Sequence, residues 1–175
     1  MKADVTKTRN IVAVLAASAL LSLAGCGFHP MYGPGIDGKP SKVVASLNNV
    51  SIENIPDRNG QILRNFLVDR MYGAKRPDRP AYRLKVSIQS SEEDLGILAN
   101  ATATRALLNM YGKYVLLDAN GKELLRGTAH SVAGFDRLDQ MYGTVAARKD
   151  AHERSLKEVS EQIVNSLTLY FSEGR

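Results

Sequence analysis

The sequence predicts an α+β fold, a two-layer sandwich in which two helices pack on a four-stranded sheet in the order β-α-β-β-β-α. Apolar residues recur at helical spacing in two segments, at about residues 62–71 and 145–170. They alternate with polar residues at 82–89, the pattern of a half-buried strand. An Asn-Gly pair at 120–121 is typical of a hairpin turn between two further strands.

The first 25 residues have the pattern of a secretory signal rather than of a folded element. Basic residues precede an apolar run at 11–23, which is shorter than the roughly 20 residues that a membrane-spanning helix needs. The run ends in Leu-Ala-Gly-Cys at 23–26, the lipobox pattern of bacterial lipoproteins. We therefore predict a lipoprotein signal peptide at 1–25 and a lipid on Cys26. The alternative is an ordinary secretory signal followed by a chance cysteine.

Cys26 is the only cysteine of the chain, and lipidation explains a thiol that would otherwise stay unpaired in an oxidising compartment. Gly27 follows it in place of the aspartate that usually retains lipoproteins in the inner membrane. We therefore expect a lipid anchor in the outer membrane, with the protein facing the periplasm. Glycine and proline are dense through residues 26–41, which predicts a flexible tether. Its few apolar side chains leave open a role on a membrane or partner surface.

The remaining residues, 42–175, have the size of a single domain. Without the signal peptide the chain keeps 20 basic and 17 acidic residues, a net charge of +3, so the +5 of the whole sequence partly reflects the signal. A mildly basic surface gives only weak support for nucleic acid or for anionic lipid. Export argues against nucleic acid as a partner.

Capping residues and prolines divide the first half of the domain into a strand, a helix and a loop. Residues 42–52 are rich in valine, leucine and isoleucine and predict the first strand. Asp-Arg-Asn-Gly at 57–60 offers the start of a helix, which continues through 62–71 and ends at Gly73. Prolines at 77 and 80 mark a loop.

The second half is mostly strands, followed by one long helix. The second strand, 82–89, precedes an acidic segment at 92–94 that we expect to be a solvated turn. The third strand spans about 99–117, with Gly112 as a candidate bulge. After the Asn-Gly turn, the fourth strand spans about 122–135, and an apolar stripe from Val145 to Tyr170 predicts the last helix.

Catalytic and metal-binding motifs are missing from the sequence. His29, His130 and His152 have no metal-ligand spacing, and there is no nucleophile elbow or phosphate-cradling glycine loop. We expect His152, on the apolar stripe of the last helix, to be a hydrogen-bonded core histidine. The sequence therefore predicts a protein that is not an enzyme and that holds no metal or cofactor.

Basic residues gather around the loop that precedes the second strand. Arginine and lysine are suited to phosphate groups, and lipid A carries both phosphates and acyl chains. A basic edge beside an apolar face therefore suits lipid A. From charge alone, Arg83, Lys85 and Arg105 are candidate contacts to lipopolysaccharide phosphates. The alternative is a solvated loop whose charge is balanced by neighbouring carboxylates.

Residues 26–33 read Cys-Gly-Phe-His-Pro-Met-Tyr-Gly, and weaker motifs lie at 58–65, 103–105, 118–121 and 149–151. Together they resemble the alphaproteobacterial LptE family of lipopolysaccharide-assembly lipoproteins over nearly all of the mature chain. The opening motif is the most specific, with methionine where the family usually has leucine.

The resemblance implies a domain of two helices and four strands, tethered to the periplasmic leaflet of the outer membrane. Members of the family plug the lumen of LptD, the β-barrel of the lipopolysaccharide translocon, and interact with lipopolysaccharide on its way to the cell surface. No family motif assigns lipopolysaccharide contacts to positions here. Two other classes stay open. One is a different lipoprotein adaptor, such as a secretin pilot or an accessory to a lipid transporter, and the other is a lipid-anchored periplasmic enzyme.

Overall fold

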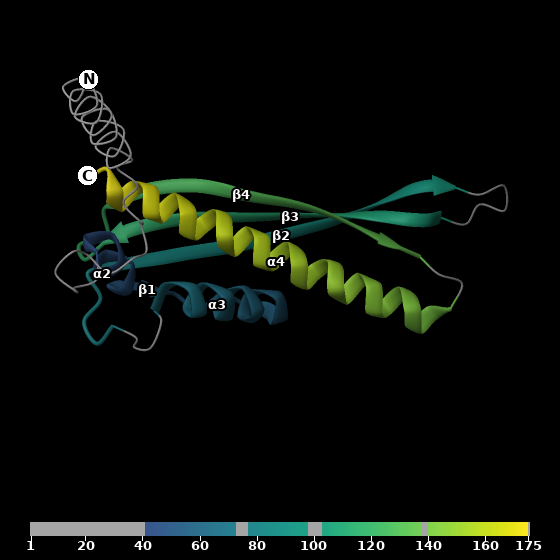
Figure 1. Ribbon diagram of the computed structural model, residues 1–175, viewed down its shortest axis with the longest axis horizontal. Helices are drawn as coiled ribbons and strands as arrows, with labels where there is room; N and C mark the ends of the chain where they lie inside the picture. Colours follow the sequence, from purple (N-terminus) through teal and green to yellow (C-terminus); the bar gives the residue numbers. More distant parts are fainter. Residues whose placement is uncertain (1–40, 73–76, 98–102, 138–139, 175) are drawn as a thin grey trace, which may run out of the picture. The chain divides into compact units, whose positions relative to one another are not determined.

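The computed structural model describes residues 41–72, 77–97, 103–137 and 140–174. Within them the elements follow in the order α2-β1-α3-β2-β3-β4-α4, labelled as in Figure 1. The predicted signal peptide, Cys26 and the predicted tether up to residue 40 lie outside the described residues. So do Gly73, where we expected the first helix to end, and residues 99–102 of the predicted third strand.

Helix α2, Lys42–Asn48, corrects the prediction of a strand from residue 42 onward. Ser41 caps its N-terminus, because the N–H of Val44 donates to the Ser41 hydroxyl at 3.3 Å. Leu47 is buried in the core, and α2 packs against α4. Only Val50–Ile52 form the strand, β1. Tertiary packing and the serine cap thus outweigh the β-propensity of the two valines.

The sheet has the order β1-β2-β3-β4. Helix α3, Asp57–Tyr72, crosses between β1 and β2, Tyr82–Ile97, and these two strands are parallel. Strands β3, Ala103–Asp118, and β4, Glu123–Asp136, continue the sheet in antiparallel pairing. The predicted α+β class and four-stranded sheet are confirmed, with three helices rather than two in the described part of the chain.

Strand β2 is twice as long as predicted, and it includes the acidic segment that we expected to be a turn. Glu92 and Asp94 are paired in register with Leu108 and Ala106 of β3. Their carboxylates point to the side of the sheet where α4 lies, and they meet arginines there. These long-range ion pairs explain why Glu92 and Asp94 lie in a strand rather than in a turn.

Gly112 does not form the predicted bulge. It is opposite Ile88 on one side and Ala129 on the other, in unbroken antiparallel register. A Cβ at Gly112 would lie 2.6 Å from Cγ1 of Val159 on α4. The glycine is therefore needed for the close approach of the helix to the sheet.

The hairpin between β3 and β4 is confirmed. Gly121 has a φ of +86°, a conformation that favours glycine. The Asp118 carboxylate accepts hydrogen bonds from the N–H groups of Asn120 and Lys122, both at 2.8 Å. The register between β3 and β4 shifts between Leu116 and Leu117, just before this turn.

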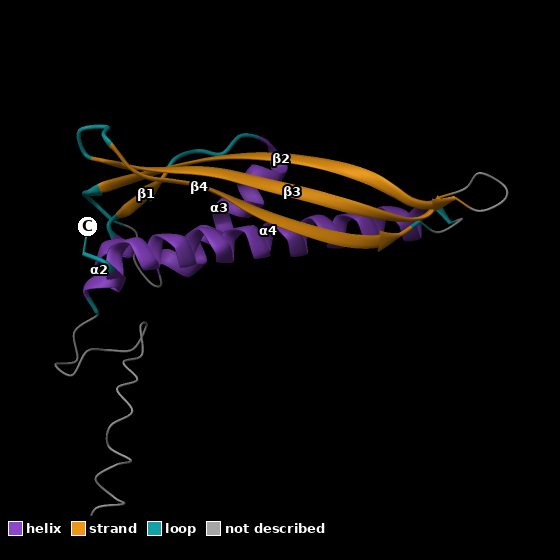
Figure 2. Cartoon of the chain, turned by 90° about the horizontal axis from the view of Figure 1, so that it is seen from above, coloured by secondary structure: helices purple, strands orange, loops and turns teal. Residues whose placement is uncertain are grey.

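Helices α2 and α4 lie along one face of the sheet (Figure 2), and α3 packs against α4. Helix α4, Met141–Ser172, has 32 residues and is about 48 Å long, so it follows the strands for most of their length. Helix α3 has 16 residues and covers only about half of that distance. The core forms where these helices meet the sheet, around the fully buried leucines 63, 67, 84, 108, 116, 156 and 167.

Candidate functional site

No described element covers the second face of the sheet, which we call the open face (Figure 2). Residues alternate between the two faces along β3: Leu108, Met110 and Leu116 are buried under the helices, whereas Tyr111 and Lys113 are exposed. Because of this alternation, one face of the sheet is packed and the other is free to contact solvent or a ligand.

A shallow depression of about 300 Å³ lies on the open face near the β3–β4 hairpin, and we call it the basic hollow. Its side chains come from three neighbouring strands. The register places Lys85 and Arg126 on either side of Val115, and Ser87 on one side of Lys113. Three cations, two of them flanking an apolar side chain, thus surround one concave surface.

The three cations of the basic hollow differ in their partners. Lys85 Nζ is 3.9 Å from the Glu53 carboxylate, at the β1 side of the sheet. Arg126 Nε donates to Glu123 at 2.9 Å, and this hydrogen bond holds the pKa of Glu123 below its usual value. Lys113 forms no ion pair with any residue that the structure describes. The central lysine is thus the cation that is free to meet an anionic ligand.

Lys113 is also flanked by hydroxyl groups. The register places Ser87 of β2 and Thr128 of β4 directly opposite it, and both side chains line the basic hollow. Hydroxyl groups and an ammonium group are all donors to phosphate oxygens. The arrangement is suited to one anionic group held over the middle of three strands.

Exposed apolar side chains are interspersed with polar ones along the open face beyond the basic hollow, and we call Tyr111, Val132 and Leu95 together the apolar band. The rings of Tyr111 and His130 stack with centroids 4.3 Å apart and an interplanar angle of 10°. Val132 and Leu95 are large apolar side chains that stay exposed further along the strands. The open face therefore carries the basic hollow at one end and a mixed surface next to it, in which Tyr111 is the first exposed apolar side chain.

The structure brings together only two of the three predicted phosphate contacts. Arg83 and Lys85 share Glu53, at 4.0 and 3.9 Å, beside the basic hollow. Arg105 lies eight residues before Lys113 on β3, which is about 27 Å along the strand. There it is 3.8 Å from Asp136.

Lys113 and Arg126 line the basic hollow, although the clustering of charge in the sequence did not point to them. Arg126 is one strand away from Lys113 in space but 13 residues away in the sequence. Arg105, Asn109 and Lys113 recur at every fourth residue and therefore share one face of a strand, and this spacing was a signal for the outward position of Lys113. The pairing across three strands was not readable from any local pattern.

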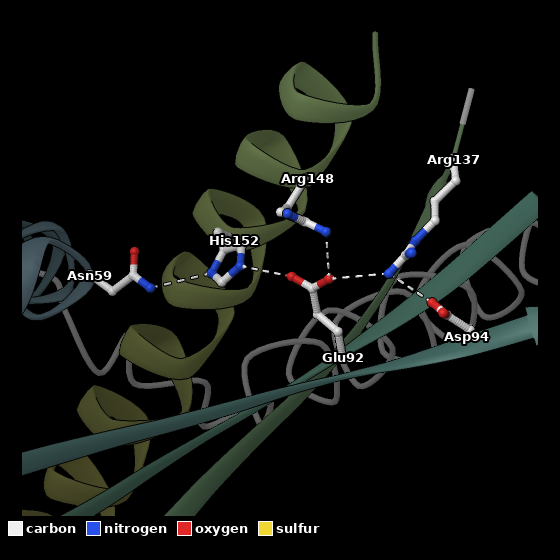
Figure 3. A network of polar contacts seen from close by, with 6 residues as sticks. All are labelled: Asn59, Glu92, Asp94, Arg137, Arg148 and His152. Atoms are coloured by element: carbon white, nitrogen blue, oxygen red, sulfur yellow. Dashed lines mark hydrogen bonds and ion pairs between the residues drawn. The ribbon is translucent and has the colours of Figure 1, made fainter. Parts of the chain in front are cut away.

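A polar network on the helical side of the sheet forms a second cluster of charged residues (Figure 3). Glu92 of β2 lies 3.0 Å from Arg148 of α4 and 3.7 Å from Arg137, and Arg137 also contacts Asp94 at 2.8 Å. The network links the far end of β2 to the residue after β4 and to α4. Its charges are mutually compensated, so we assign it a structural role.

His152 joins this network instead of lying in the apolar core. Its Nε2 is 3.8 Å from the Glu92 carboxylate, and the Asn59 amide nitrogen of α3 is 3.3 Å from its Nδ1 (Figure 3). The side chain is hydrogen-bonded, as we expected, but it is only partly buried and lies outside the core. Among the described residues, no group of three histidine, cysteine or carboxylate side chains is placed to hold a metal ion. None of the described helices is long and apolar enough to cross a membrane.

Comparison with known proteins gives a family match. Residues 47–167 match the family model LptE, described as lipopolysaccharide-assembly. No curated protein matches the sequence.

Three solved structures share the fold. A putative lipoprotein from Caulobacter crescentus is 27% identical, with a TM-score of 0.64, covering 77% of this chain and 98% of that one. Lipoprotein B from Nitrosomonas europaea is 18% identical, with a TM-score of 0.57 and coverage of 71% and 84%. A minor lipoprotein from Acinetobacter baumannii is 16% identical, with a TM-score of 0.51 and coverage of 69% and 90%. The last two show a likeness of fold alone.

Proposed function

The chain belongs to the LptE family of lipopolysaccharide-assembly proteins, and from this premise we propose that it binds lipopolysaccharide on the open face of its sheet while complexed with an LptD-like barrel. The observation that carries the proposal is the arrangement of the open face. A free lysine between two hydroxyl groups lies next to an exposed apolar band. Lipid A presents phosphates beside acyl chains, which is the complementary arrangement.

The basic hollow is the proposed phosphate site. Lys113 supplies an ammonium group without an internal partner in the described chain, and Arg126 supplies a planar guanidinium group at its edge. Arg83 and Lys85 add positive charge on the β1 side, although both share Glu53. Arg105 is too far along β3 to meet the same phosphate, so it would contact a different part of the ligand.

The apolar band is the proposed surface for the acyl chains. Tyr111, Val132 and Leu95 are exposed large apolar side chains on the same face as the basic hollow. Each apolar side chain that is covered by an acyl chain contributes roughly 25 cal/mol per Å² of buried area. The band therefore adds affinity for a lipid over a free phosphate.

Photo-crosslinking tests the lipid assignment directly. A photo-reactive phenylalanine analogue in place of Tyr111, in the full-length protein in native cells, should give an adduct that antibodies to lipopolysaccharide recognise. The same analogue at Tyr142, which lies on helix α4 away from the open face, should give much less. Adducts of equal yield at both positions would argue against binding by the open face.

We propose that residues 1–25 are removed and that Cys26 carries the lipid that anchors the protein in the outer membrane. The lipobox and the lipoproteins with the same fold support this assignment. Because Cys26 is the only cysteine, labelling with an alkyne fatty acid should be lost completely in Cys26→Ser. The variant should also be lost from the outer-membrane fraction.

The proposed partner is the β-barrel LptD, whose lumen the domain would plug. Family membership supports it. The native complex should be recovered from outer membranes in mild detergent, with a large translocon barrel in a ratio near one to one by mass spectrometry. Recovery of a secretin or an inner-membrane transporter instead would favour a different adaptor role.

A further inference from the structure

A second concave surface lies on the side of the domain opposite to the open face. It has a volume of about 330 Å³ and is formed where the start of α3 meets the first half of α4. We call it the α3–α4 groove. Its apolar wall is Ile62 and Val145, and its cations are Arg58, Arg148 and Lys149. Pockets that bind ligands begin at about this size.

The charges of the groove are not balanced within the described chain. Arg148 is held by Glu92 at 3.0 Å, but neither Arg58 nor Lys149 forms an ion pair with any described residue. The lining contains one carboxylate, that of Glu153. Arg58 lies in the first turn of α3, where the helix dipole disfavours a cation, so its position does not serve the helix. Two cations thus flank an apolar wall without an internal partner.

The start of α4 extends the groove as an exposed apolar strip. Met141, Tyr142 and Val145 are 78%, 92% and 58% exposed. The apolar stripe of the sequence placed Val145 in the core, but α3 is too short to reach this end of α4 (Figure 1). Folding of the described domain therefore leaves these three side chains unburied.

We propose that the α3–α4 groove and this strip form a docking surface for an acidic segment of a partner protein, with a carboxylate between Arg58 and Lys149 and an apolar residue against Ile62 and Val145. Tyrosine, methionine and arginine are enriched in protein–protein interfaces. Clusters of basic side chains are a recurring means of recognising acidic motifs. The docking surface does not depend on lipopolysaccharide binding, because the open face is on the other side of the sheet.

Photo-crosslinking in native membranes, with the full-length protein, tests the docking surface. A photo-reactive phenylalanine analogue replaces Val145 in one variant of the protein. In a second variant the analogue replaces Val132 on the open face, and this variant is the control. The expected product at Val145 is a protein adduct. Mass spectrometry of that adduct should find aspartate or glutamate within a few residues of the crosslinked position.

A charge reversal shows whether the adduct at Val145 depends on binding by the basic side chains or only on a protein being nearby. Arg58→Glu with Lys149→Glu should lower the Val145 adduct at least about fivefold, which corresponds to roughly 1 kcal/mol. The matched control is Arg79→Glu with Lys122→Glu, two exposed cations away from the groove, and its adduct yield should be unchanged. Circular dichroism checks that both double variants stay folded.

Three results would overturn the proposal. The first is that the analogue at Val145 forms adducts to lipid only, and the second is a protein adduct that the charge reversal leaves unchanged. The third is that Val145 gives no adduct while Val132 gives one.

Lipopolysaccharide binding is measured on the same variants. If it stays normal in Arg58→Glu with Lys149→Glu while the Val145 adduct is lost, docking and lipid binding are separate. If lipopolysaccharide binding is missing from the unmodified protein, the proposed function fails without affecting the docking result.

Discussion

The side-chain amide of Gln162 pairs with both backbone groups of His130. The His130 N–H donates to Oε1 of Gln162 at 3.0 Å, and Nε2 of Gln162 donates to the His130 carbonyl at 2.8 Å. His130 lies on β4, which is an edge strand of the sheet. A helix side chain thus takes the place of a neighbouring strand, and this blocks one point of the edge against pairing with another chain.

Gln162→Ala should expose this edge. We expect the purified domain to form dimers or larger species at concentrations where the unmodified protein is monomeric, because two unpaired backbone groups become available. Analytical ultracentrifugation over a concentration series measures the change. The matched control is Asn165→Ala, which removes an exposed amide from the same helix. Equal behaviour of the two variants would show that Gln162 does not protect the edge.

Tyr72 plays a similar part at the other edge strand, β1. Its buried hydroxyl donates to the Val50 carbonyl at 2.5 Å and accepts from the Ile52 N–H at 3.2 Å. Tyr72→Phe should lower the free energy of unfolding by about 1–3 kcal/mol, since it leaves buried backbone groups without partners. Chemical denaturation measures this, with Tyr142→Phe on the exposed strip as a control that should change nothing. A loss below about 0.5 kcal/mol would contradict the assigned role.

Gly112→Ala should destabilise the domain, because its new methyl group would meet Val159 at 2.6 Å. Overpacking of a rigid core costs about 1–3 kcal/mol. Val159→Ala should cost stability by itself and yet partly rescue Gly112→Ala, so that the double-mutant cycle is strongly non-additive. Additive effects would mean that α4 moves away from the sheet instead of clashing with it.

Ser155→Ala should be neutral or stabilising. Ser155 is fully buried, and its hydroxyl has no hydrogen-bond partner among the described residues. Removing an unpaired buried hydroxyl avoids its desolvation cost, and alanine is the better helix former. We expect a gain of about 1 kcal/mol, seen as a rise of several degrees in Tm. A loss of stability would show that the hydroxyl has a partner after all.

Local patterns were sufficient where a few neighbouring residues decide the structure. The alternation after Tyr82 predicted β2, and Asn120 with Gly121 predicted the hairpin turn. The stripe that ends near Tyr170 predicted α4. In these places the periodicity of apolar residues and the turn chemistry agree with the tertiary structure.

The predictions failed where contacts between residues far apart in the sequence decide the secondary structure. Val43 and Val44 favour a strand by propensity, but the Ser41 cap and packing against α4 make them helical. The acidic segment around Glu92 was expected to be a turn, and it is held in β2 by Arg137 and Arg148 from far along the chain. Contacts of this kind leave no trace in a short window of sequence.

The sequence predicted the type of candidate site but not most of the residues that line it. The sequence indicated basic residues near an apolar face, and Lys85 does line the basic hollow. Lys113 and Arg126 became part of it only through the register of three strands. Arg105 was grouped with Lys85 by charge, although β3 separates them by most of its length.

Binding of purified, delipidated protein to immobilised lipopolysaccharide, comparing Lys113→Glu with Lys122→Glu, tests the central claim most directly. Both substitutions change the net charge equally, but Lys122 lies in the β3–β4 turn outside the basic hollow. We predict that Lys113→Glu weakens binding about tenfold, or roughly 1.4 kcal/mol, and that Lys122→Glu has little effect. Equal affinities for the two variants would contradict lipopolysaccharide binding by the open face.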